Sequence, residues 1–128
     1  MRNKIRFLHG GLMTSIQDRG RSGYMQYGVA PAGAMDLFSM SIANLLVGNN
    51  KEEAVLETTY LGPTIEFLCD ETISITGAKT LVTLNDLPVP LWQSLEVKAG
   101  DILKMNHTVS GIYNYIAFSR GQIGRAHV

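Results

Sequence analysis

A cluster of polar residues between positions 17 and 36 is the part of the sequence best suited to chemistry. Gln17 and Asp18 are followed by Arg19 and Arg21, in a stretch rich in glycine. A guanidinium binds a carboxylate or phosphate through two parallel hydrogen bonds, and glycine lets a ligand approach the backbone closely. The alternative is that Asp18 pairs with an arginine and only fixes the loop. Taken together, the residues indicate a binding site.

Three further residues carry polar side chains at positions where a packed domain does not need them. Asp36 precedes a helical pattern, where its carboxylate can cap the helix, and a helix N-terminus is also a ready anion site. Asn44 lies within that otherwise apolar pattern, where an amide without partners costs about 1–3 kcal/mol, so it must bond backbone or a ligand. Glu57, in a predicted strand, is a candidate acid, base or ligand anchor, or else faces solvent.

Several common kinds of active site are excluded by the motifs. Residues 77–80, Gly-Ala-Lys-Thr, look like the end of a phosphate loop, but the upstream glycine is missing and no helix is predicted after them. His9, His107 and His127 do not have metal-ligand spacing, and a single cysteine gives no pair for zinc, so we predict no metal site. No serine stands in a nucleophile-elbow motif.

Composition indicates an ordinary soluble globular protein. The 128 residues carry a formal net charge of zero, which gives no electrostatic basis for binding nucleic acid or an anionic membrane. No apolar run is long enough to span a bilayer, and the basic N-terminus is not followed by an apolar signal core. Cys69 has no cysteine to pair with and is expected to be a buried small hydrophobe. We therefore expect a cytoplasmic protein.

The elements that position the polar cluster are predicted to be strands around one helix. Residues 4–9 and 13–17 alternate apolar and polar and flank Gly10-Gly11, which predicts a strand pair with a tight turn. The helix is predicted over residues 36–47, with Asp36 as N-cap and Gly48 as a left-handed C-terminal cap. Short strands are then predicted over 54–59, 64–68, 72–76, 80–84, 95–98, 102–105 and 112–118. Trp92 is expected to pack in the core.

Several spaced motifs occur in an order that resembles the biotin-dependent carboxyltransferase family. This family includes the C-type component of 5-oxoprolinase, the KipI-antagonist protein and the allophanate hydrolase subunit 2-like region of urea-processing enzymes. The resemblance runs from Gly11 to Phe118. It is carried by these residues: Gly11, Thr14, Gln17, Asp18, Gly20, Arg21, Gly23, Gly28, Gly33-Ala34-Met35-Asp36, Ala43-Asn44, Val47-Gly48-Asn49, Leu56-Glu57, Thr59, Gly62-Pro63, Ile75-Thr76-Gly77-Ala78, Trp92, Gly100-Asp101, Gly111, Tyr113 and Tyr115.

The resemblance implies a mainly β (α+β) fold of the cyclophilin-like β-barrel type. This chain would be the N-terminal part of that barrel, so we expect its fold to be incomplete. Residues 1–118 would form that part, and residues 119–128 depart from the family pattern. The last six residues resemble the translation of a common sequencing-library adapter. We expect the tail to be a truncation artefact of a longer reading frame, the alternative being a natural tail.

The resemblance also implies a function. It implies a component of an ATP-dependent enzyme that acts on a lactam or amide, most closely 5-oxoprolinase, which converts 5-oxo-L-proline to L-glutamate. Partners would be a KipI-like protein, the B-type component, and a third, A-type protein; ATP would belong to the complex, and biotin only to fused carboxylase relatives. One alternative is a urea carboxylase or allophanate hydrolase component acting on a urea-type substrate. Another is a non-catalytic regulatory protein that binds a KipI-like kinase inhibitor.

Six residues of this sequence stand at the family's recurring polar positions. We predict three catalytic residues, Asp18, Arg21 and Glu57, and three substrate-binding residues, Gln17, Asp36 and Asn44. In this hypothesis Arg21 binds an anion and a carboxylate orients the amide N–H of the substrate.

Overall fold

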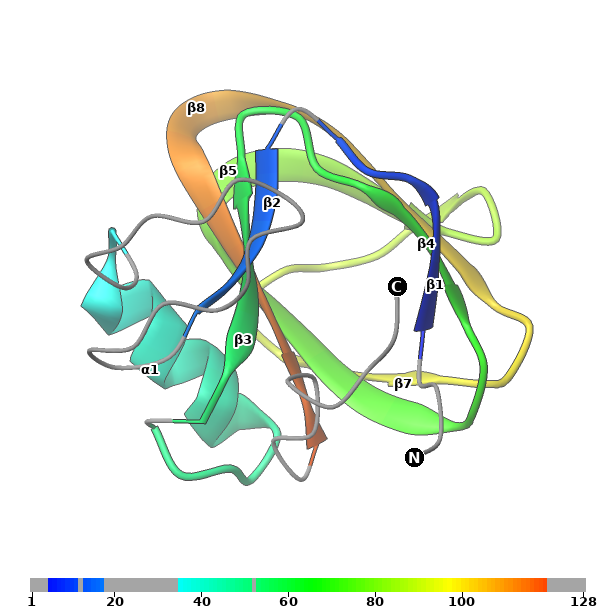
Figure 1. Ribbon diagram of the computed structural model, residues 1–128, viewed down its shortest axis with the longest axis horizontal. Coiled ribbons are helices and arrows are strands. Elements are labelled where there is room, and N and C mark those ends of the chain that lie inside the picture. The colour runs from blue at the N-terminus through cyan, green and yellow to red at the C-terminus, as the bar shows by residue number, and fades with distance from the viewer. Residues whose placement is uncertain (1–4, 12, 18–34, 52, 120–128) are drawn as a thin grey trace.

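The computed structural model describes residues 5–11, 13–17, 35–51 and 53–119, and these form one antiparallel sheet with one helix (Figure 1). The elements in chain order are β1 (Ile5–His9), β2 (Met13–Gln17), α1 (Leu37–Leu46), β3 (Val55–Thr59), β4 (Thr64–Phe67), β5 (Glu71–Leu84), β6 (Leu87–Pro88), β7 (Ser94–Val97) and β8 (Ile102–Phe118). The predicted fold class, mainly β with a single helix at about 36–47, is confirmed.

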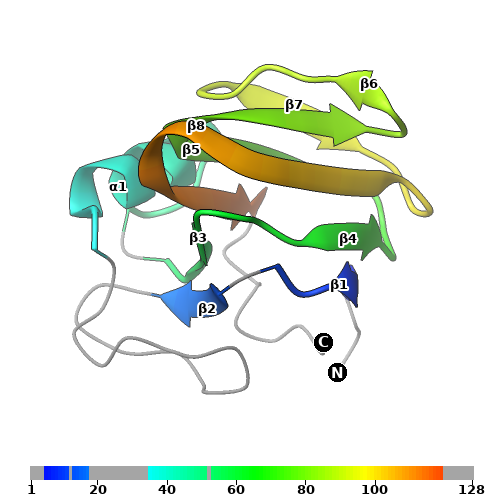
Figure 2. The same cartoon turned by 90° about the horizontal axis from the view of Figure 1, so that it is seen from above.

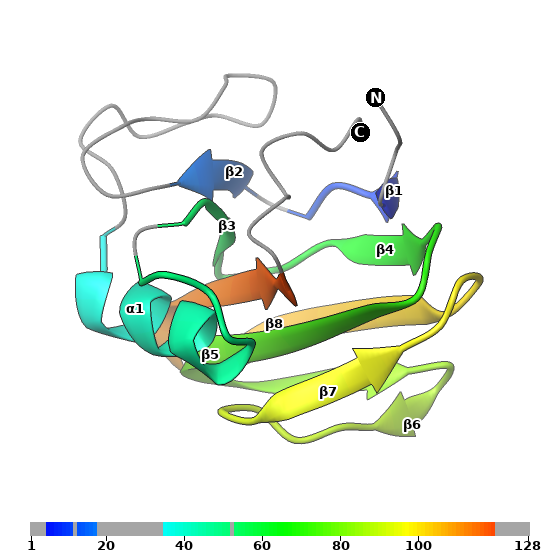
Figure 3. The same cartoon turned by 90° about the horizontal axis from the view of Figure 1, so that it is seen from below.

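The longest strands, β5 and β8, form the centre of the sheet. These two strands pair with each other along one edge of β8. Along its other edge, β8 pairs with β3 through residues 113–116 and with β4 through residues 102–104. β2 and β1 extend the sheet beyond β3 and β4, whereas β6 and β7 both pair with β5 on the opposite side (Figures 2 and 3). Within the described residues β1 and β2 do not pair with β6 or β7, so the curved sheet is open there.

The predicted hairpin between residues 4–9 and 13–17 is wrong. β1 pairs with β4 and β2 pairs with β3, so the chain continues along the sheet edge instead of reversing at Gly10-Gly11. Gly11 has a φ of 76°, and a Cβ there would lie 2.6 Å from the carbonyl oxygen of Leu61. The paired glycines therefore allow a bend that passes close to the neighbouring backbone. Paired glycines alone do not distinguish such a bend from a hairpin turn.

Two pairs of predicted short strands are each a single bent strand. Residues 72–76 and 80–84 both belong to β5, and residues 102–105 and 112–118 both belong to β8. The bends fall at Gly77, with a φ of 99°, and Gly111, with a φ of 92°. The ladder between β5 and β8 continues past them with register shifts, because β-bulges absorb the extra residues.

The curved sheet has a different core on each face. The inner face carries the larger apolar cluster, which includes Leu56, Ile75 and Ile116 from the three central strands. The outer face is covered by α1, whose Met40 and Ala43 pack on Val55, Tyr115 and Ala117. Because side chains alternate between faces along each strand, the residues next to the inner apolar ones lie under the helix.

Polar side chains also fasten the helix to the sheet. The hydroxyl of Ser74 donates to the carbonyl oxygen of Ala43 at 2.6 Å, and that of Thr76 donates to the carbonyl oxygen of Ser39 at 2.7 Å. Both hydroxyls are buried, so each hydrogen bond is shielded from water. The helix, and with it the position of its N-terminus, is thereby fixed relative to β5.

Candidate functional site

A row of three side chains crosses the sheet beneath the N-terminus of α1. Glu57 of β3 is paired in register with Tyr115 of β8, and Tyr115 is paired on its other side with Thr76 of β5. Glu57 is 4% exposed and Tyr115 and Thr76 are fully buried. Glu57 therefore does not face solvent, because the helix covers the sheet face to which it points.

Hydrogen bonds join this row to the start of the helix. Oε2 of Glu57 accepts the Tyr115 hydroxyl at 2.6 Å and the backbone N–H of Met35 at 2.9 Å. The Tyr115 oxygen in turn accepts the backbone N–H of Asp36 at 2.8 Å. The carboxylate and the phenol therefore hold two consecutive backbone N–H groups just before the helix begins.

The environment of Tyr115 keeps its hydroxyl protonated. Burial raises the pKa of Tyr115 far above its usual value of 10.0, and the hydrogen bond to the Glu57 carboxylate raises it further. A phenolate there would lie next to a carboxylate in a poorly solvated position. Tyr115 is accordingly a hydrogen-bond donor to Glu57 at neutral pH.

Asp36 is the N-cap of α1, as predicted. Its Oδ1 accepts the backbone N–H of Ser39 at 3.0 Å and its Oδ2 accepts the Ser39 hydroxyl at 2.7 Å. Its carboxylate thus takes the place at the helix N-terminus that an external anion would occupy. These contacts give Asp36 a structural role, and its assignment to substrate binding remains a prediction.

The two described residues on either side of the polar segment, Gln17 and Met35, both contact β3. The backbone of Gln17, at the end of β2, is paired with Val55 of β3. Met35 is held by Glu57, two residues further along β3. The structure therefore links Asp36 to Glu57 through Tyr115 and brings the backbone of Gln17 to the strand that carries Glu57. Asp18 and Arg21 lie outside the described residues, and their roles remain predictions.

Asn44 is used inside the protein. It is fully buried, and its Nδ2 donates to the carbonyl oxygens of Lys51 at 3.3 Å and Glu53 at 2.8 Å. Its Oδ1 accepts from Nδ2 of Asn49 at 3.2 Å. The amide therefore holds the backbone of Lys51 and Glu53 against the helix that they follow. Substrate binding by Asn44 stays a prediction, and these contacts do not support it.

Tyr115 and Asn114 are site-building residues that sequence reasoning missed. Nδ2 of Asn114 donates to the carbonyl oxygens of Thr76 at 3.1 Å and Ala78 at 2.8 Å, and its Oδ1 accepts the Thr80 hydroxyl at 2.8 Å. Asn114 thereby fixes the bend of β5 around Gly77. Both residues lie in the predicted strand 112–118, and the only local signal is that this otherwise apolar strand contains polar side chains.

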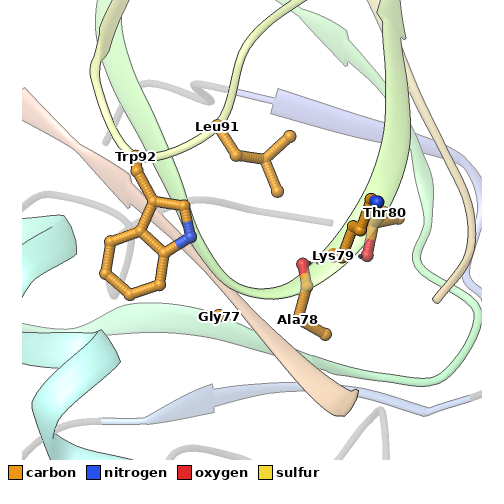
Figure 4. A pocket seen from close by; sticks show the side chains of 6 residues that line it. All are labelled: Gly77, Ala78, Lys79, Thr80, Leu91 and Trp92. Carbon is orange, nitrogen blue, oxygen red and sulfur yellow. Dashed lines mark hydrogen bonds between the residues drawn. The ribbon is translucent and has the colours of Figure 1, made fainter. Parts of the chain in front are cut away.

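A second feature is a pocket of about 230 Å³ on the side of the β5 bend. Its lining residues are Gly77, Ala78, Lys79, Thr80, Leu91 and Trp92, and we call it the Trp92 pocket (Figure 4). Trp92 is 42% exposed, so the expectation that it packs in the core is wrong. Its backbone N–H is bound by the carbonyl oxygen of Ile75 at 2.7 Å, which holds the residue at the sheet edge instead.

The described residues contain no group of three His, Cys, Asp or Glu side chains arranged to hold a metal ion. Within the same part of the chain, no helix has the length and apolar character needed to cross a bilayer.

Comparisons with known proteins agree on one family. Residues 27–126 match the family model described as the carboxyltransferase domain, subdomain A and B. The chain is 41% identical over 112 residues to urea amidolyase of Saccharomyces cerevisiae, covering 87% of this chain and 6% of the relative. It is 36% identical over 117 residues to the C-type component of 5-oxoprolinase from Escherichia coli, covering 91% of this chain and 38% of the relative.

The solved structures agree with the sequence relatives. The crystal structure of Kluyveromyces lactis urea carboxylase superposes with a TM-score of 0.80 at 37% identity, covering 92% of this chain and 11% of that one. The chain thus spans well under half the length of the relatives that it matches.

Proposed function

We propose, from the premise that this chain belongs to the carboxyltransferase domain family (subdomain A and B), that it is a component of an ATP-dependent enzyme that processes a lactam or amide. The assignment we favour is the C-type component of a 5-oxoprolinase, which opens 5-oxo-L-proline to L-glutamate. It is supported by the match to the relative with that name over 117 residues at 36% identity. Partners would be a KipI-like B-type protein and an A-type protein.

The observation that carries this proposal is that Gln17 and Met35, on either side of the polar segment, both contact β3. Met35 is bound by Glu57 at 2.9 Å and the backbone of Gln17 is paired with Val55, so the residues on either side of the polar segment are held two positions apart on one strand. A strand that fixes both ends in this way suits a segment whose side chains must meet a substrate accurately. We propose that Arg21 binds the substrate carboxylate and that Asp18 orients the lactam N–H.

The contacts of Glu57 favour a positioning role. Its Oε2 already accepts two hydrogen bonds, from Tyr115 and from Met35, and the side chain is 4% exposed. A general base must reach the proton that it removes, directly or through one water. We therefore propose that Glu57 positions the C-terminal end of the polar segment. The alternative is that Glu57 is a catalytic residue, and a Glu57→Gln variant distinguishes the two roles.

Two features that commonly bind phosphate are not available in the described residues. Residues 77–80, Gly-Ala-Lys-Thr, lie within β5 and are not followed by a helix, and the N-terminus of α1 is capped by the carboxylate of Asp36. We therefore propose that ATP is bound by a partner protein of the complex. Biotin would concern only a fused carboxylase.

Reconstitution tests this proposal. The chain is mixed with purified candidate A-type and KipI-like proteins, and ATP hydrolysis and glutamate release are followed with 5-oxo-L-proline as substrate. Glutamate release that requires all three proteins is the expected result. Complex formation without any turnover would contradict the proposal and favour a regulatory protein that binds a KipI-like partner.

A second candidate is a component of a urea carboxylase or urea amidolyase. It is favoured by the higher identity, 41%, to the yeast urea amidolyase. The same reconstitution distinguishes the two when urea and bicarbonate replace 5-oxoproline and a biotin carboxylase with its biotin-bearing carrier is supplied. Urea-dependent ATP hydrolysis without glutamate release from 5-oxoproline would replace the first assignment with the second.

A further inference from the structure

We propose that the Trp92 pocket is a binding site for a small carboxylate with a single ring. The proposal concerns binding by this chain alone and does not depend on the turnover proposed above. The pocket is formed by the bend of β5 and by Leu91 and Trp92 of the segment leading to β7, away from the row of Glu57 and Tyr115.

Trp92 is held in a conformation that packing alone does not explain. Its φ is 63°, in the left-handed region that bulky residues rarely adopt, and 42% of the residue remains exposed. The backbone hydrogen bond to Ile75 maintains this conformation. Strained backbone is concentrated at ligand sites, and here it presents the edge of the indole that carries Nε1 to the pocket (Figure 4).

Two side chains of the pocket supply hydrogen-bond donors. Lys79 is exposed and supplies an ammonium, and Trp92 supplies its indole N–H. The Thr80 hydroxyl is already used, since it donates to Oδ1 of Asn114 at 2.8 Å. None of the lining residues is acidic, and in the described part of the chain no carboxylate forms an ion pair with Lys79. A ligand must therefore bring acceptors, and a carboxylate matches the cation best.

The apolar lining residues indicate the part of the ligand that does not carry the charge. The indole ring and the Leu91 side chain line the pocket, so the ring of a ligand gains from burial there. The volume of about 230 Å³ suits a molecule with a single small ring. A bare inorganic anion would leave these apolar walls unused.

The pocket is built on fixed backbone. Gly77 has a φ of 99°, and a Cβ there would lie 2.2 Å from the carbonyl oxygen of Tyr113, so β5 and β8 are in close contact at its floor. Asn114, 1% exposed, binds the carbonyl oxygens on both sides of this glycine, those of Thr76 and Ala78. Because these contacts are made between groups of the fold itself, binding does not have to order the site first.

Trp92 is the only tryptophan in the chain, so its fluorescence reports on this pocket alone. The full chain is titrated with 5-oxo-L-proline and with cyclopentanecarboxylate, which share ring size and carboxylate, and with the uncharged lactam 2-pyrrolidinone. We expect a saturable change in emission with both carboxylates and a much weaker one with 2-pyrrolidinone. The midpoint is expected near about 1 mM, given the few atoms in such a ligand.

Lys79→Met tests the role of the cation, and Lys104→Met, an exposed lysine on β8 outside the pocket, is the matched control. Lys79→Met should weaken carboxylate binding about tenfold, whereas Lys104→Met should leave it unchanged. Isothermal titration calorimetry of Trp92→Leu, which should no longer bind, supplies a readout that does not need the indole. Equal binding of 2-pyrrolidinone, equal loss in both lysine variants, or no saturable change would overturn the proposal.

Discussion

The hydroxyl of Tyr115 donates a 2.6 Å hydrogen bond to Oε2 of Glu57 while accepting the backbone N–H of Asp36 at 2.8 Å. One phenol thus connects two strands of the sheet to the start of the helix. Its partner carboxylate holds the preceding residue, Met35. This small network anchors the C-terminal end of the polar segment, and the first predictions concern its strength.

Tyr115→Phe should lower the free energy of unfolding by about 1–3 kcal/mol, because it removes the donor from a buried carboxylate and the acceptor from a backbone N–H. Urea denaturation followed by circular dichroism measures the change. Tyr113→Phe, on the same strand but only partly buried, is the control and should change stability by less than about 0.5 kcal/mol. Equal effects of the two variants would show that the hydroxyl of Tyr115 adds nothing special.

The same pair of residues predicts a dependence on alkaline pH. The pKa of Tyr115 is raised in the folded protein above its usual value of 10.0, so its contribution to stability is fully present below pH 10.0 and is lost as the pH rises further. The stability difference between the wild type and Tyr115→Phe should therefore shrink above pH 10.0. A difference that stays constant from pH 7 to pH 11 would contradict the raised pKa.

Glu57→Gln separates positioning from acid–base catalysis. Glutamine keeps an oxygen that can accept from Tyr115 and Met35 but cannot exchange a proton, so a positioning role predicts that the reconstituted enzyme keeps most of its kcat. Glu57→Ala, which removes the acceptor, should lower it strongly. If Glu57 is instead the general base, Glu57→Gln should itself reduce kcat by about 10²-fold or more.

Asn114→Ala should destabilise the protein by about 3 kcal/mol, because three hydrogen bonds in a buried position lose their partner. Asn106→Ala is the matched control: it also removes an asparagine of β8 that donates to β5, at the carbonyl oxygen of Leu81, but from a more exposed position. The control should cost less than about 0.5 kcal/mol. Thermal unfolding of both variants measures the difference, and similar losses would argue against the buried network.

Much of the fold could be predicted because its signals are local. The helix follows from the spacing of apolar residues and from Asp36 and Gly48, which has a φ of 80°. Strand pairing could not be predicted in the same way. Gly10-Gly11 and Gly77 carry turn signals, yet the chain does not reverse at either, because the neighbouring strand, which decides the outcome, is far away in the sequence.

The candidate site could be predicted only in part for the same reason. Asp36 and Glu57 stand out as polar residues in apolar surroundings, and the structure places them in one network with Tyr115. The partner of Glu57 is 58 positions away, and no pattern near either residue links them. A large aromatic residue such as Trp92 is usually expected in the core. Its left-handed backbone conformation places it at the surface, and the sequence does not reveal that conformation.

The central claim, that the segment between Gln17 and Asp36 carries the function, is tested most directly by the turnover of Arg21→Ala in the reconstituted enzyme. Arg6→Ala is the control, since Arg6 pairs with Glu66 on the exposed edge between β1 and β4. Glutamate release from 5-oxo-L-proline should fall by about 10²-fold in Arg21→Ala and stay near wild type in Arg6→Ala. Full turnover by an Arg21→Ala protein that still assembles with its partners would contradict the account.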